Sequence, residues 1–450
     1  MAGIEWHSGS LDAAFALASA QQRPLFLYWG AVWCPPCNRV KSEIFARDEF
    51  RQRMASLLPY QLDGDGAGAQ ALAAQYRLRS YPTLVLFAPA GHEITRLPCE
   101  LDGELFTAAL DNALAVWRAG SSAAQALDAA LFGSRALSGG EWSLLSHYSW
   151  DTDEGALLGE RGLAPTLLAL ASRAALAGAA DAAARLGLFA QLATGANGDA
   201  TANAAALLAV FSDARIARAN MDVLTNSGIN LIKFATRREE LVAALNRVAA
   251  AWSEDFWLSA PDRLMALRLQ MRLTRLVAAS EGLQKQVRSR VDEALAESTD
   301  PYERHTLVNT AVSALNDAGL PQLAEQVLQA ELPRSHSPYY FMLSLAAAAK
   351  RRGDTAGVLS WYEQAAAGAV GYATRIQWRS TYLTSLLDLA PQDTARIERA
   401  AAVLLADISA ASDAFQQRNL SQLQKLAPKL AGQAVGEQAR TLLLAIQPIR

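Results

Sequence analysis

The feature that most constrains this fold is a short, wholly apolar run that ends just before a closely spaced pair of cysteines. Leu25-Phe26-Leu27-Tyr28-Trp29 contains no charged residue, and Cys34 and Cys37 follow after a short loop. Such a run is typical of a strand that is buried on both faces, as in a sheet covered by helices. The sequence therefore predicts that a buried strand leads into the Cys34-Pro35-Pro36-Cys37 motif at the start of a helix.

The segments around this run complete an α/β pattern. Apolar residues spaced three or four apart predict helices, and short apolar runs bounded by turn residues predict strands. The expected helices are 11–21, 35–54, 69–76 and 103–117, and the expected strands are 25–29, 60–63, 83–87 and 93–97. The order αβαβαββα predicts an α/β domain over residues 1–118, with a mixed sheet and helices on both faces.

The composition changes after this domain. Ala119-Gly120-Ser121-Ser122-Ala123-Ala124 is a stretch of small residues, and we interpret 119–124 as a linker. Beyond it, alanine and leucine dominate, apolar residues recur every three to four positions, and prolines stand at intervals. Because 450 residues exceed what one core usually serves, we expect a second, all-α domain at 125–450, with about a dozen helices or slightly more, mostly in antiparallel pairs.

One internal repeat is visible in the helical part. Gly319 and Gly353 lie 34 residues apart, each before a similar apolar segment, and 34 residues is the tetratricopeptide (TPR) period. Residues 339–367 resemble one degenerate TPR unit. A generic bundle of α-hairpins explains the same spacing, and both interpretations stay open.

Charge and hydropathy limit the classes of partner. The formal net charge is −3, so the chain lacks the basic signature of nucleic-acid or membrane-surface binding. No apolar run approaches the 18 or so residues that a membrane span needs. The first residues, 1–7, lack the basic and apolar regions of a secretory signal. Two locations therefore remain: the cytoplasm, or the periplasm if a signal peptide has been removed.

The cysteines predict chemistry rather than a disulfide scaffold. Cys34, Cys37 and Cys99 are the three cysteines of the sequence, too few for stapling a chain of this length. A zinc site would need four ligands, and neither Cys99 nor the five histidines stand at ligand spacing, so we expect no metal.

The motif predicts thiol–disulfide exchange on physical grounds. Cys34 would precede a helix, whose free N–H groups and positive dipole end stabilise a thiolate, the attacking species in exchange. Pro35 and Pro36 suit a first helical turn, where a missing N–H has no partner to lose. Cys37 lies one turn later and would resolve the mixed disulfide, while Trp33 would cover one side of the thiol.

These residues resemble the thioredoxin superfamily. Residues 25–37 match its strand, loop and active-site helix, and Arg79-Ser80-Tyr81-Pro82-Thr83-Leu84-Val85-Leu86-Phe87 matches the segment that holds its cis-proline. Within the superfamily, 41–50 and 99–106 resemble the C-terminal domain of DsbD, a thiol:disulfide interchange protein. The resemblance covers about 115 residues.

The resemblance implies a thioredoxin fold and several site roles. Pro82 would be cis, and the edge of Tyr81 and Pro82 would lie beside Cys34 and offer backbone groups to a substrate strand. No cofactor is implied beyond the redox-active disulfide of Cys34 and Cys37. The implied partners are protein thiols or disulfides and a redox protein that reduces or oxidises the pair. The likeness to a bacterial envelope reductase favours the periplasm.

The sequence departs from the family pattern at three positions. Thioredoxins usually carry a buried aspartate where this chain has Tyr28, and Gln61 takes the place of the lysine that often partners it. Glu43 is a possible replacement for that aspartate, although we favour the interpretation that Glu43 lies on a solvated helix face. Cys99 takes the place of a glycine that borders the substrate groove; it is either a small half-buried residue without a role or a third redox thiol that gates substrates.

Other marked residues receive structural interpretations. Asp63-Gly64-Asp65-Gly66 lacks the terminal glutamate of a calcium loop, and we interpret it as a turn. The tryptophans beyond the linker, Trp378 among them, are expected in the helical core.

Two functions follow from these observations. The first is a thiol:disulfide oxidoreductase in which Cys34 attacks, Cys37 resolves and the helical domain selects protein substrates, with the redox direction open. The second is a chaperone-like or scaffold module in which the helices bind partners and the redox domain is an accessory.

Overall fold

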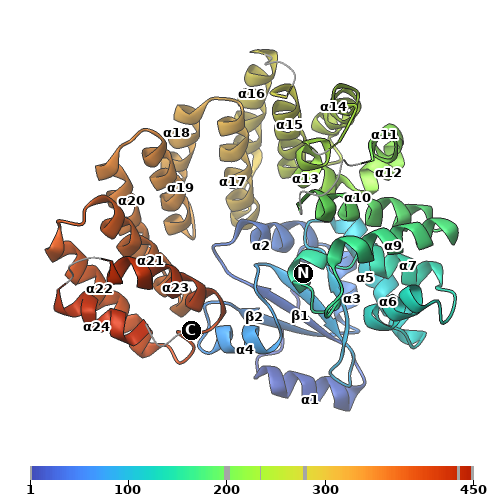
Figure 1. Ribbon diagram of the computed structural model, residues 1–450, viewed down its shortest axis with the longest axis horizontal. Coiled ribbons are helices and arrows are strands. Elements are labelled where there is room, and N and C mark those ends of the chain that lie inside the picture. The colour runs from blue at the N-terminus through green and yellow to red at the C-terminus, as the bar shows by residue number, and fades with distance from the viewer. Residues whose placement is uncertain (1–2, 197–202, 234, 277–280, 433–435, 447–450) are drawn as a thin grey trace. The chain divides into compact units, whose positions relative to one another are not determined.

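The computed structural model describes residues 3–196, 203–233, 235–276, 281–432 and 436–446 (Figure 1). Residues 3–118 form the expected α/β arrangement. Its elements are α1 (Leu11–Gln21), β1 (Leu25–Gly30), α2 (Pro35–Arg39), the π-helical turn η1 (Val40–Phe45), α3 (Asp48–Met54), β2 (Leu58–Asp63), α4 (Ala69–Gln75), β3 (Thr83–Phe87), β4 (Glu93–Leu97) and α5 (Gly103–Arg118).

The four strands form one mixed sheet in the order β2-β1-β3-β4, which confirms the predicted fold class. All six residues of β1 are buried, as expected for an apolar strand with neighbours on both sides. β3 and β4 pair antiparallel, with Leu84 opposite Leu97, and the pairing is irregular at Leu86 and Phe87. β1 ends four residues before Cys34, so the central strand leads directly into the motif.

The helix expected over 35–54 is divided into α2, η1 and α3. Arg47 has an extended backbone (φ −77°, ψ 137°) and interrupts the helix, and Asp48 and Glu49 favour a new start because acidic side chains stabilise a first turn. Apolar spacing does not reveal the break, because Ile44 on one side and Phe50 on the other are both buried. The prediction of one continuous helix is therefore wrong.

The rest of the described chain is helical, which confirms the second part of the fold prediction. Its first helices are α6 (Ala123–Phe132), α7 (Gly139–Ser146), α8 (Trp150–Asp153), α9 (Leu163–Leu176), α10 (Ala180–Ala196), α11 (Ala204–Ser212), α12 (Ala214–Ala219), α13 (Met221–Lys233), α14 (Arg238–Glu254), α15 (Ala260–Thr274), α16 (Glu281–Glu297) and α17 (Pro301–Asp317). The remaining helices are α18 (Pro321–Glu331), α19 (Pro338–Arg351), α20 (Thr355–Gly368), α21 (Tyr372–Leu389), α22 (Thr394–Ala410), α23 (Gln417–Ala431) and α24 (Glu437–Ile446).

The sequence predicts too few helices for this part. Between α6 and α24 the described residues form nineteen helices, more than the expected dozen or so. The difference comes partly from short helices such as α12, which ends at Ala219 without a proline or glycine signal. Gly319 and Gly353 lie in turns that follow α17 and α19, with φ values of 77° and 72°, which favour glycine. The assignment of a TPR array stays a prediction.

Contacts between residues divide the chain into two compact units that do not follow the predicted linker. One unit comprises 1–28, 38–60 and 83–320, and the other comprises 29–37, 61–82 and 321–450. In the first, α9 packs on α10, α14 on α15, and α5 on α7. In the second, α19 to α22 pack in succession, α21 also packs on α23, and α23 contacts α4. Independent folding of residues 1–118 stays a prediction.

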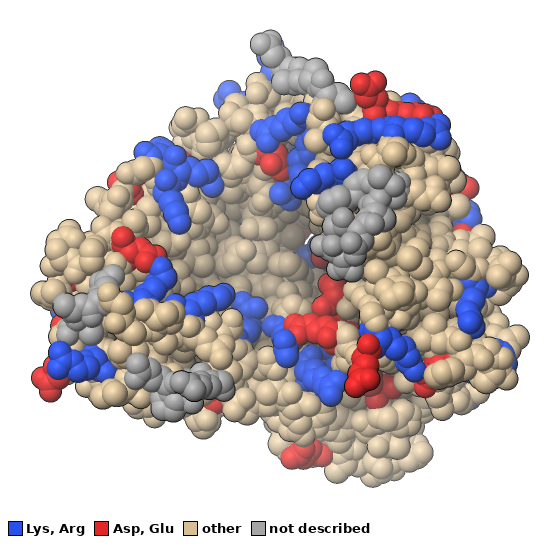
Figure 2. Space-filling view, in the orientation of Figure 1, with Lys and Arg blue, Asp and Glu red and all other residues tan. Residues whose placement is uncertain are grey.

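The surface carries mixed charge. On the face shown in Figure 2, lysine and arginine side chains are interspersed with aspartate and glutamate among many uncharged residues. This distribution agrees with a net charge of −3. Within the described residues, no helix is both long enough and apolar enough to cross a membrane.

Candidate functional site

The two motif cysteines lie together at the start of α2. Cys34 directly precedes Pro35, the first residue of the helix, and the backbone N–H of Cys37 donates a hydrogen bond to Cys34 Sγ at 3.3 Å. Both cysteines are buried and carry free thiols in this structure. Since a helical turn separates them, the second thiol is placed to reach a sulfur bonded to the first.

Burial changes the acidity of the Cys34 thiol. The side chain of Cys34 is only 3% exposed, and this burial raises the pKa of its thiol well above the usual value. The neighbouring Cys37 side chain raises the pKa further, whereas the Cys37 N–H and the charge of Arg418 lower it. Desolvation therefore outweighs the hydrogen bond and the nearby cation, and stabilisation of a Cys34 thiolate by the helix start stays a prediction.

Trp33 is enclosed by aromatic residues from distant helices. Its ring stacks on Tyr340 of α19, with centroids 5.7 Å apart and planes at 20°, and meets Trp378 of α21 edge-on at 4.9 Å. Tyr81 contacts it edge-on at 5.7 Å. Burial and the nearby Cys34 raise the pKa of Tyr340 to about 12, so its hydroxyl stays neutral at physiological pH. The helical part of the chain thus supplies part of the surroundings of the motif.

A polar contact fixes the indole of Trp33. Its Nε1–H lies 2.6 Å from Thr374 Oγ1 and 3.2 Å from Asp65 Oδ2. Asp65 also accepts hydrogen bonds from the backbone N–H of Thr374 at 2.7 Å and from its hydroxyl at 2.9 Å. Because the Asp65 carboxyl is buried, its pKa is raised to about 6.

Asp65 lies in the turn between β2 and α4, as predicted for that segment. Its backbone carbonyl accepts a hydrogen bond from the N–H of Tyr372 at 3.2 Å. Gly371 precedes α21 with φ 96°, and a Cβ there would lie 2.4 Å from the Asp65 Cβ. Glycine is therefore required for the start of α21 to approach this turn.

The predicted substrate edge has the expected conformation. The peptide bond between Tyr81 and Pro82 is cis, which is the conformation that the family resemblance implies. The Tyr81 hydroxyl accepts a hydrogen bond from Gln70 Nε2 at 3.0 Å. The guanidinium of Arg418 lies over the Tyr81 ring at 4.7 Å and 5.9 Å from the Trp33 ring centroid.

Several residues around the motif were not predicted. Arg418, Thr374 and Tyr340 stand within amphipathic helices and match no local motif, so only their packing reveals them. Trp378 is buried as expected, and it also contacts Trp33. Asp413 accepts a hydrogen bond from the Gln70 N–H at 2.8 Å, which ties the loop before α23 to α4.

Other predicted residues have structural surroundings. Tyr28 is buried and packs edge-on against Phe45 with centroids 5.1 Å apart. Pro35 and Pro36 occupy the first turn of α2, as predicted. Cys99 is 9% exposed, and its Sγ lies 3.9 Å from the carbonyl oxygen of Leu97. The roles assigned to these residues stay predictions.

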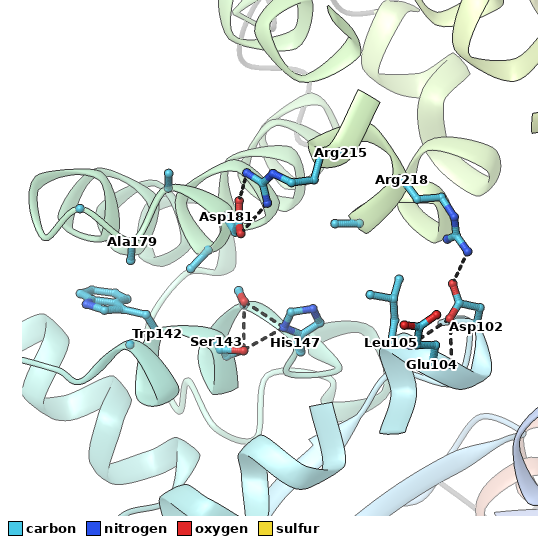
Figure 3. A pocket seen from close by; sticks show the side chains of 16 residues that line it. Asp102, Glu104, Leu105, Trp142, Ser143, His147, Ala179, Asp181, Arg215 and Arg218 are labelled. Atoms are coloured by element: carbon cyan, nitrogen blue, oxygen red, sulfur yellow. Dashed lines mark hydrogen bonds and ion pairs between the residues drawn. The ribbon is translucent and has the colours of Figure 1, made fainter. Parts of the chain in front are cut away.

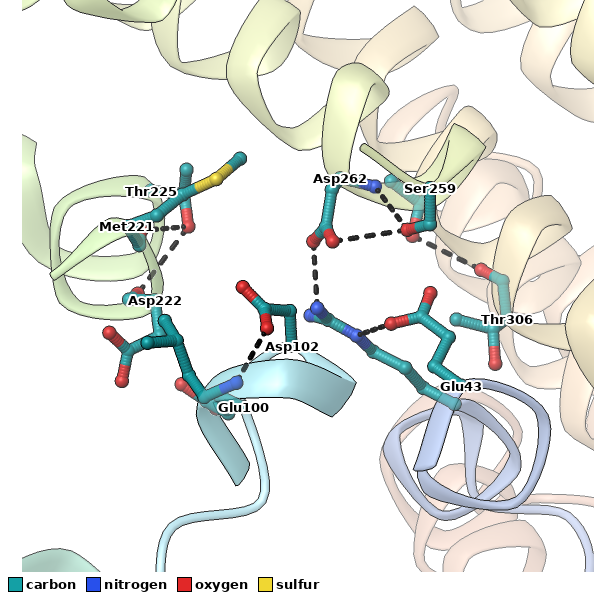
Figure 4. A network of polar contacts seen from close by, with 12 residues as sticks. Glu43, Glu100, Asp102, Met221, Asp222, Thr225, Ser259, Asp262 and Thr306 are labelled. Atoms are coloured by element: carbon teal, nitrogen blue, oxygen red, sulfur yellow. Dashed lines mark hydrogen bonds and ion pairs between the residues drawn. The ribbon is translucent and has the colours of Figure 1, made fainter. Parts of the chain in front are cut away.

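Glu43 does not lie on a solvated helix face. It forms a 2.8 Å ion pair with Arg39, which also pairs with Asp262 of α15 at 2.7 Å (Figure 4). Burial raises the pKa of Glu43, and Asp262 opposes the effect of Arg39. Glu100 lies in the same network, and burial with nearby carboxylates raises its pKa to about 7. The expectation of solvation is wrong because α15 covers this side of the helical turn.

A separate cavity of about 880 Å³ lies between α5, α7, α10 and α12 (Figure 3). Four of its charged side chains form two ion pairs: Arg215 binds Asp181 at 2.8 Å, and Arg218 binds Asp102 at 2.7 Å. Burial lowers the pKa of His147 to about 4, so that this side chain is neutral at physiological pH. No predicted site residue lines this cavity. Among the described residues, no group of three histidine, cysteine or carboxylate side chains could hold a metal ion.

The comparisons with known proteins agree with this geometry. Residues 11–114 match the family of thioredoxin-like domains. The N-terminal part of the chain is therefore a thioredoxin-like domain with a redox-active cysteine pair. The chain is similar to the thiol:disulfide interchange protein DsbD 1 of Pseudomonas aeruginosa, with 29% identity over 112 residues, which cover 24% of this chain and 19% of the relative.

A second relative supports the same assignment. The thiol:disulfide interchange protein DsbD of Yersinia pestis (strain Pestoides F) is 31% identical over 104 residues, or 22% of this chain and 18% of that protein. The chain thus spans about a fifth of the length of these curated relatives. The likeness supports a thiol-disulfide oxidoreductase at the level of the domain family.

Proposed function

We propose that this protein exchanges disulfides with protein substrates through Cys34 and Cys37, and that its helical part selects those substrates. The observation that carries the proposal is the hydrogen bond from the Cys37 N–H to Cys34 Sγ at 3.3 Å, at the start of a helix in a thioredoxin-like domain. This bond favours the thiolate of Cys34 and holds the second cysteine within one turn of it.

The reaction needs two exchange steps. The Cys34 thiolate attacks one sulfur of a substrate disulfide, forming a mixed disulfide and releasing the other substrate sulfur as a thiolate. The Cys37 thiolate then attacks Cys34 Sγ, which releases the second substrate thiol and leaves an oxidised Cys34–Cys37 pair. A redox partner protein must supply two electrons to reduce the pair again, and the reverse sequence oxidises a substrate dithiol.

Selection by the helical part follows from the burial of the nucleophile. Cys34 is 3% exposed, and the adjoining Trp33 is covered by Tyr340 and Trp378. A folded substrate therefore reaches Cys34 Sγ only after local rearrangement of its surroundings. Substrates that bind the helices and displace these contacts would react faster than substrates that do not.

Trapping of mixed disulfides tests the proposal. Cys37→Ser should accumulate mixed disulfides with substrates because the resolving thiol is absent, whereas Cys34→Ser should trap none. The wild-type protein should also reduce insulin in a reductant-dependent assay. Absence of both trapped adducts and insulin reduction would refute the enzyme; suppression of aggregation by Cys34→Ser would instead support the chaperone-like alternative.

The proposed location is the periplasm. Disulfides form and persist in oxidising compartments, so a thiol:disulfide interchange protein has substrates there. Cell fractionation of the natural gene product tests this location, and recovery with cytoplasmic markers would contradict it.

A further inference from the structure

A polar groove of about 710 Å³ lies along the first turns of α23. Its lining residues are Ala74, Arg79, Gln416, Gln417, Arg418, Leu420, Ser421, Gln422, Gln424 and Lys425. Three of these residues are cationic and four are glutamines, and no aspartate or glutamate is among them. The groove therefore offers positive charge together with amide groups that both donate and accept hydrogen bonds.

One end of the groove contacts the redox site. Arg418 lines the groove, and its guanidinium lies 4.7 Å from the centroid of the Tyr81 ring and 5.9 Å from that of Trp33. Trp33 directly precedes Cys34, and Tyr81 precedes the cis-proline. A polypeptide that lies in the groove thus runs next to the residues that flank the nucleophile.

Two of the three cations of the groove, Arg418 and Lys425, are available to a ligand. Within the described residues, neither Arg418 nor Lys425 forms an ion pair, and Lys425 is exposed. Arg418 Nε instead donates a long hydrogen bond, 3.4 Å, to the side-chain oxygen of Gln377. A carboxylate that entered the groove would therefore gain charge-assisted hydrogen bonds without breaking an existing ion pair.

We propose that this groove binds an extended segment of the disulfide substrate that carries aspartate or glutamate beside its reactive cysteine. The inference rests on the proposed function, because it names the class of substrate for that site. Positive side chains attract the carboxylates, and the four glutamines suit the N–H and C=O groups of an extended main chain. The lack of a lining carboxylate disfavours segments that carry lysine or arginine.

Peptide disulfides of matched sequence test the proposal in the full-length protein. Three peptides would carry two glutamates, two glutamines or two lysines next to the disulfide, and glutathione disulfide would serve as a small carboxylate-bearing control. The rate constant for reduction by pre-reduced protein is measured in single turnover at low and high salt. Because each of its two glutamates would form an exposed charge pair, the acidic peptide should react roughly 2- to 30-fold faster than the neutral one.

Salt and charge reversal provide the matched controls. The preference for the acidic peptide should shrink at 0.5 M salt, because exposed charges are then screened. Lys425→Glu should abolish the preference. Lys350→Glu makes the same change at an exposed position on α19, outside the groove, and should preserve it.

The outcomes separate this inference from the proposed function. Reduction of acidic and neutral peptides at equal rates, or a preference that survives Lys425→Glu, would overturn the acidic-substrate inference while leaving the oxidoreductase intact. A preference for glutathione disulfide without one for the acidic peptide would also overturn it. Failure to reduce any of the disulfides would instead refute the proposed function.

Discussion

The indole Nε1–H of Trp33 donates to the hydroxyl of Thr374 at 2.6 Å, although the two residues are 341 positions apart in the chain. The bond joins the residue before Cys34 to the first turn of α21. Thr374 also donates its own hydroxyl and N–H to Asp65. A helix far from the cysteine motif in sequence therefore helps to fix the side chain that directly precedes Cys34.

Removal of the Thr374 hydroxyl should loosen the Trp33 side chain. Thr374→Val keeps the shape of the side chain but deletes an acceptor and a donor, and one buried hydrogen bond is worth about 1 kcal/mol. If local opening exposes Cys34, its alkylation by iodoacetamide should become about fivefold faster. Thr381→Val is the control, because among the described residues that hydroxyl bonds only the Gln377 carbonyl, one turn earlier in the same helix. Equal alkylation rates in the two variants would contradict the role of Thr374.

The pKa of the Cys34 thiol should lie above that of an ordinary cysteine. Thiolate absorbance near 240 nm in a Cys37→Ser, Cys99→Ser background reports this group alone. Arg418→Gln should move the titration to still higher pH, because the positive charge of Arg418 favours the thiolate. Lys350→Gln, which removes a charge elsewhere, should not shift it. A midpoint below about 8.5 would indicate that the helix start outweighs burial after all.

Asp65 should make the protein less stable as the pH rises from about 4 to 6. The folded state raises the pKa of this carboxyl from 3.8 to about 6, so it binds a proton more tightly than the unfolded chain. The protonated carboxyl therefore stabilises the folded state fully below pH 3.8. This stabilisation is lost as the pH rises through the folded-state pKa of about 6, which lowers the free energy of unfolding by on the order of 3 kcal/mol.

Comparison of the wild-type protein with Asp65→Asn isolates this group. Denaturant unfolding at several pH values gives the difference in the free energy of unfolding between the two proteins. As the pH rises from 4 to 6, the free energy of unfolding of the wild-type protein should fall relative to that of the variant, because the variant has no titrating group at this position. A difference independent of pH would show that Asp65 keeps an ordinary pKa.

The predicted domain boundary can be tested with fragments. Residues 1–120 should fold alone and keep disulfide-reducing activity, and residues 125–450 should give a circular dichroism spectrum of nearly pure helix. In the short fragment, Trp33 loses Tyr340, Thr374 and Trp378, so its fluorescence should report greater exposure to water. An unfolded short fragment would mean that the C-terminal helices are part of the folding unit.

Cys99 has two interpretations that differ in a measurable way. If it is a third redox thiol, mass spectrometry of the mildly oxidised Cys37→Ser protein should detect a Cys34–Cys99 crosslink. If it is a small buried residue, 9% exposed as in this structure, it should stay reduced. In the second case Cys99→Gly should also leave turnover unchanged.

Much of the N-terminal fold can be predicted from short stretches of the sequence. The apolar runs of β1 and β3 cannot be exposed to water, and their lengths match strands. The motif from Trp33 to Cys37 and the Tyr81–Pro82 segment carry the likeness to thioredoxins in a few consecutive residues. The sequence failed at the interruption by Arg47, because buried residues continue with helical spacing on both sides of the break.

The sequence by itself determined the chemistry: the pair of thiols, their spacing, the preceding buried strand and the class of domain. Only the tertiary structure decided the surroundings of that chemistry. The burial that raises the pKa of Cys34 and the position of the Asp65 carboxyl beside Trp33 depend on packing in the folded chain. Thr374 approaches Asp65, and Arg418 approaches Trp33, from more than 300 residues away in the sequence. A periodic apolar pattern states that a helix is buried, but it does not state against which residues, because many helix faces satisfy the same pattern.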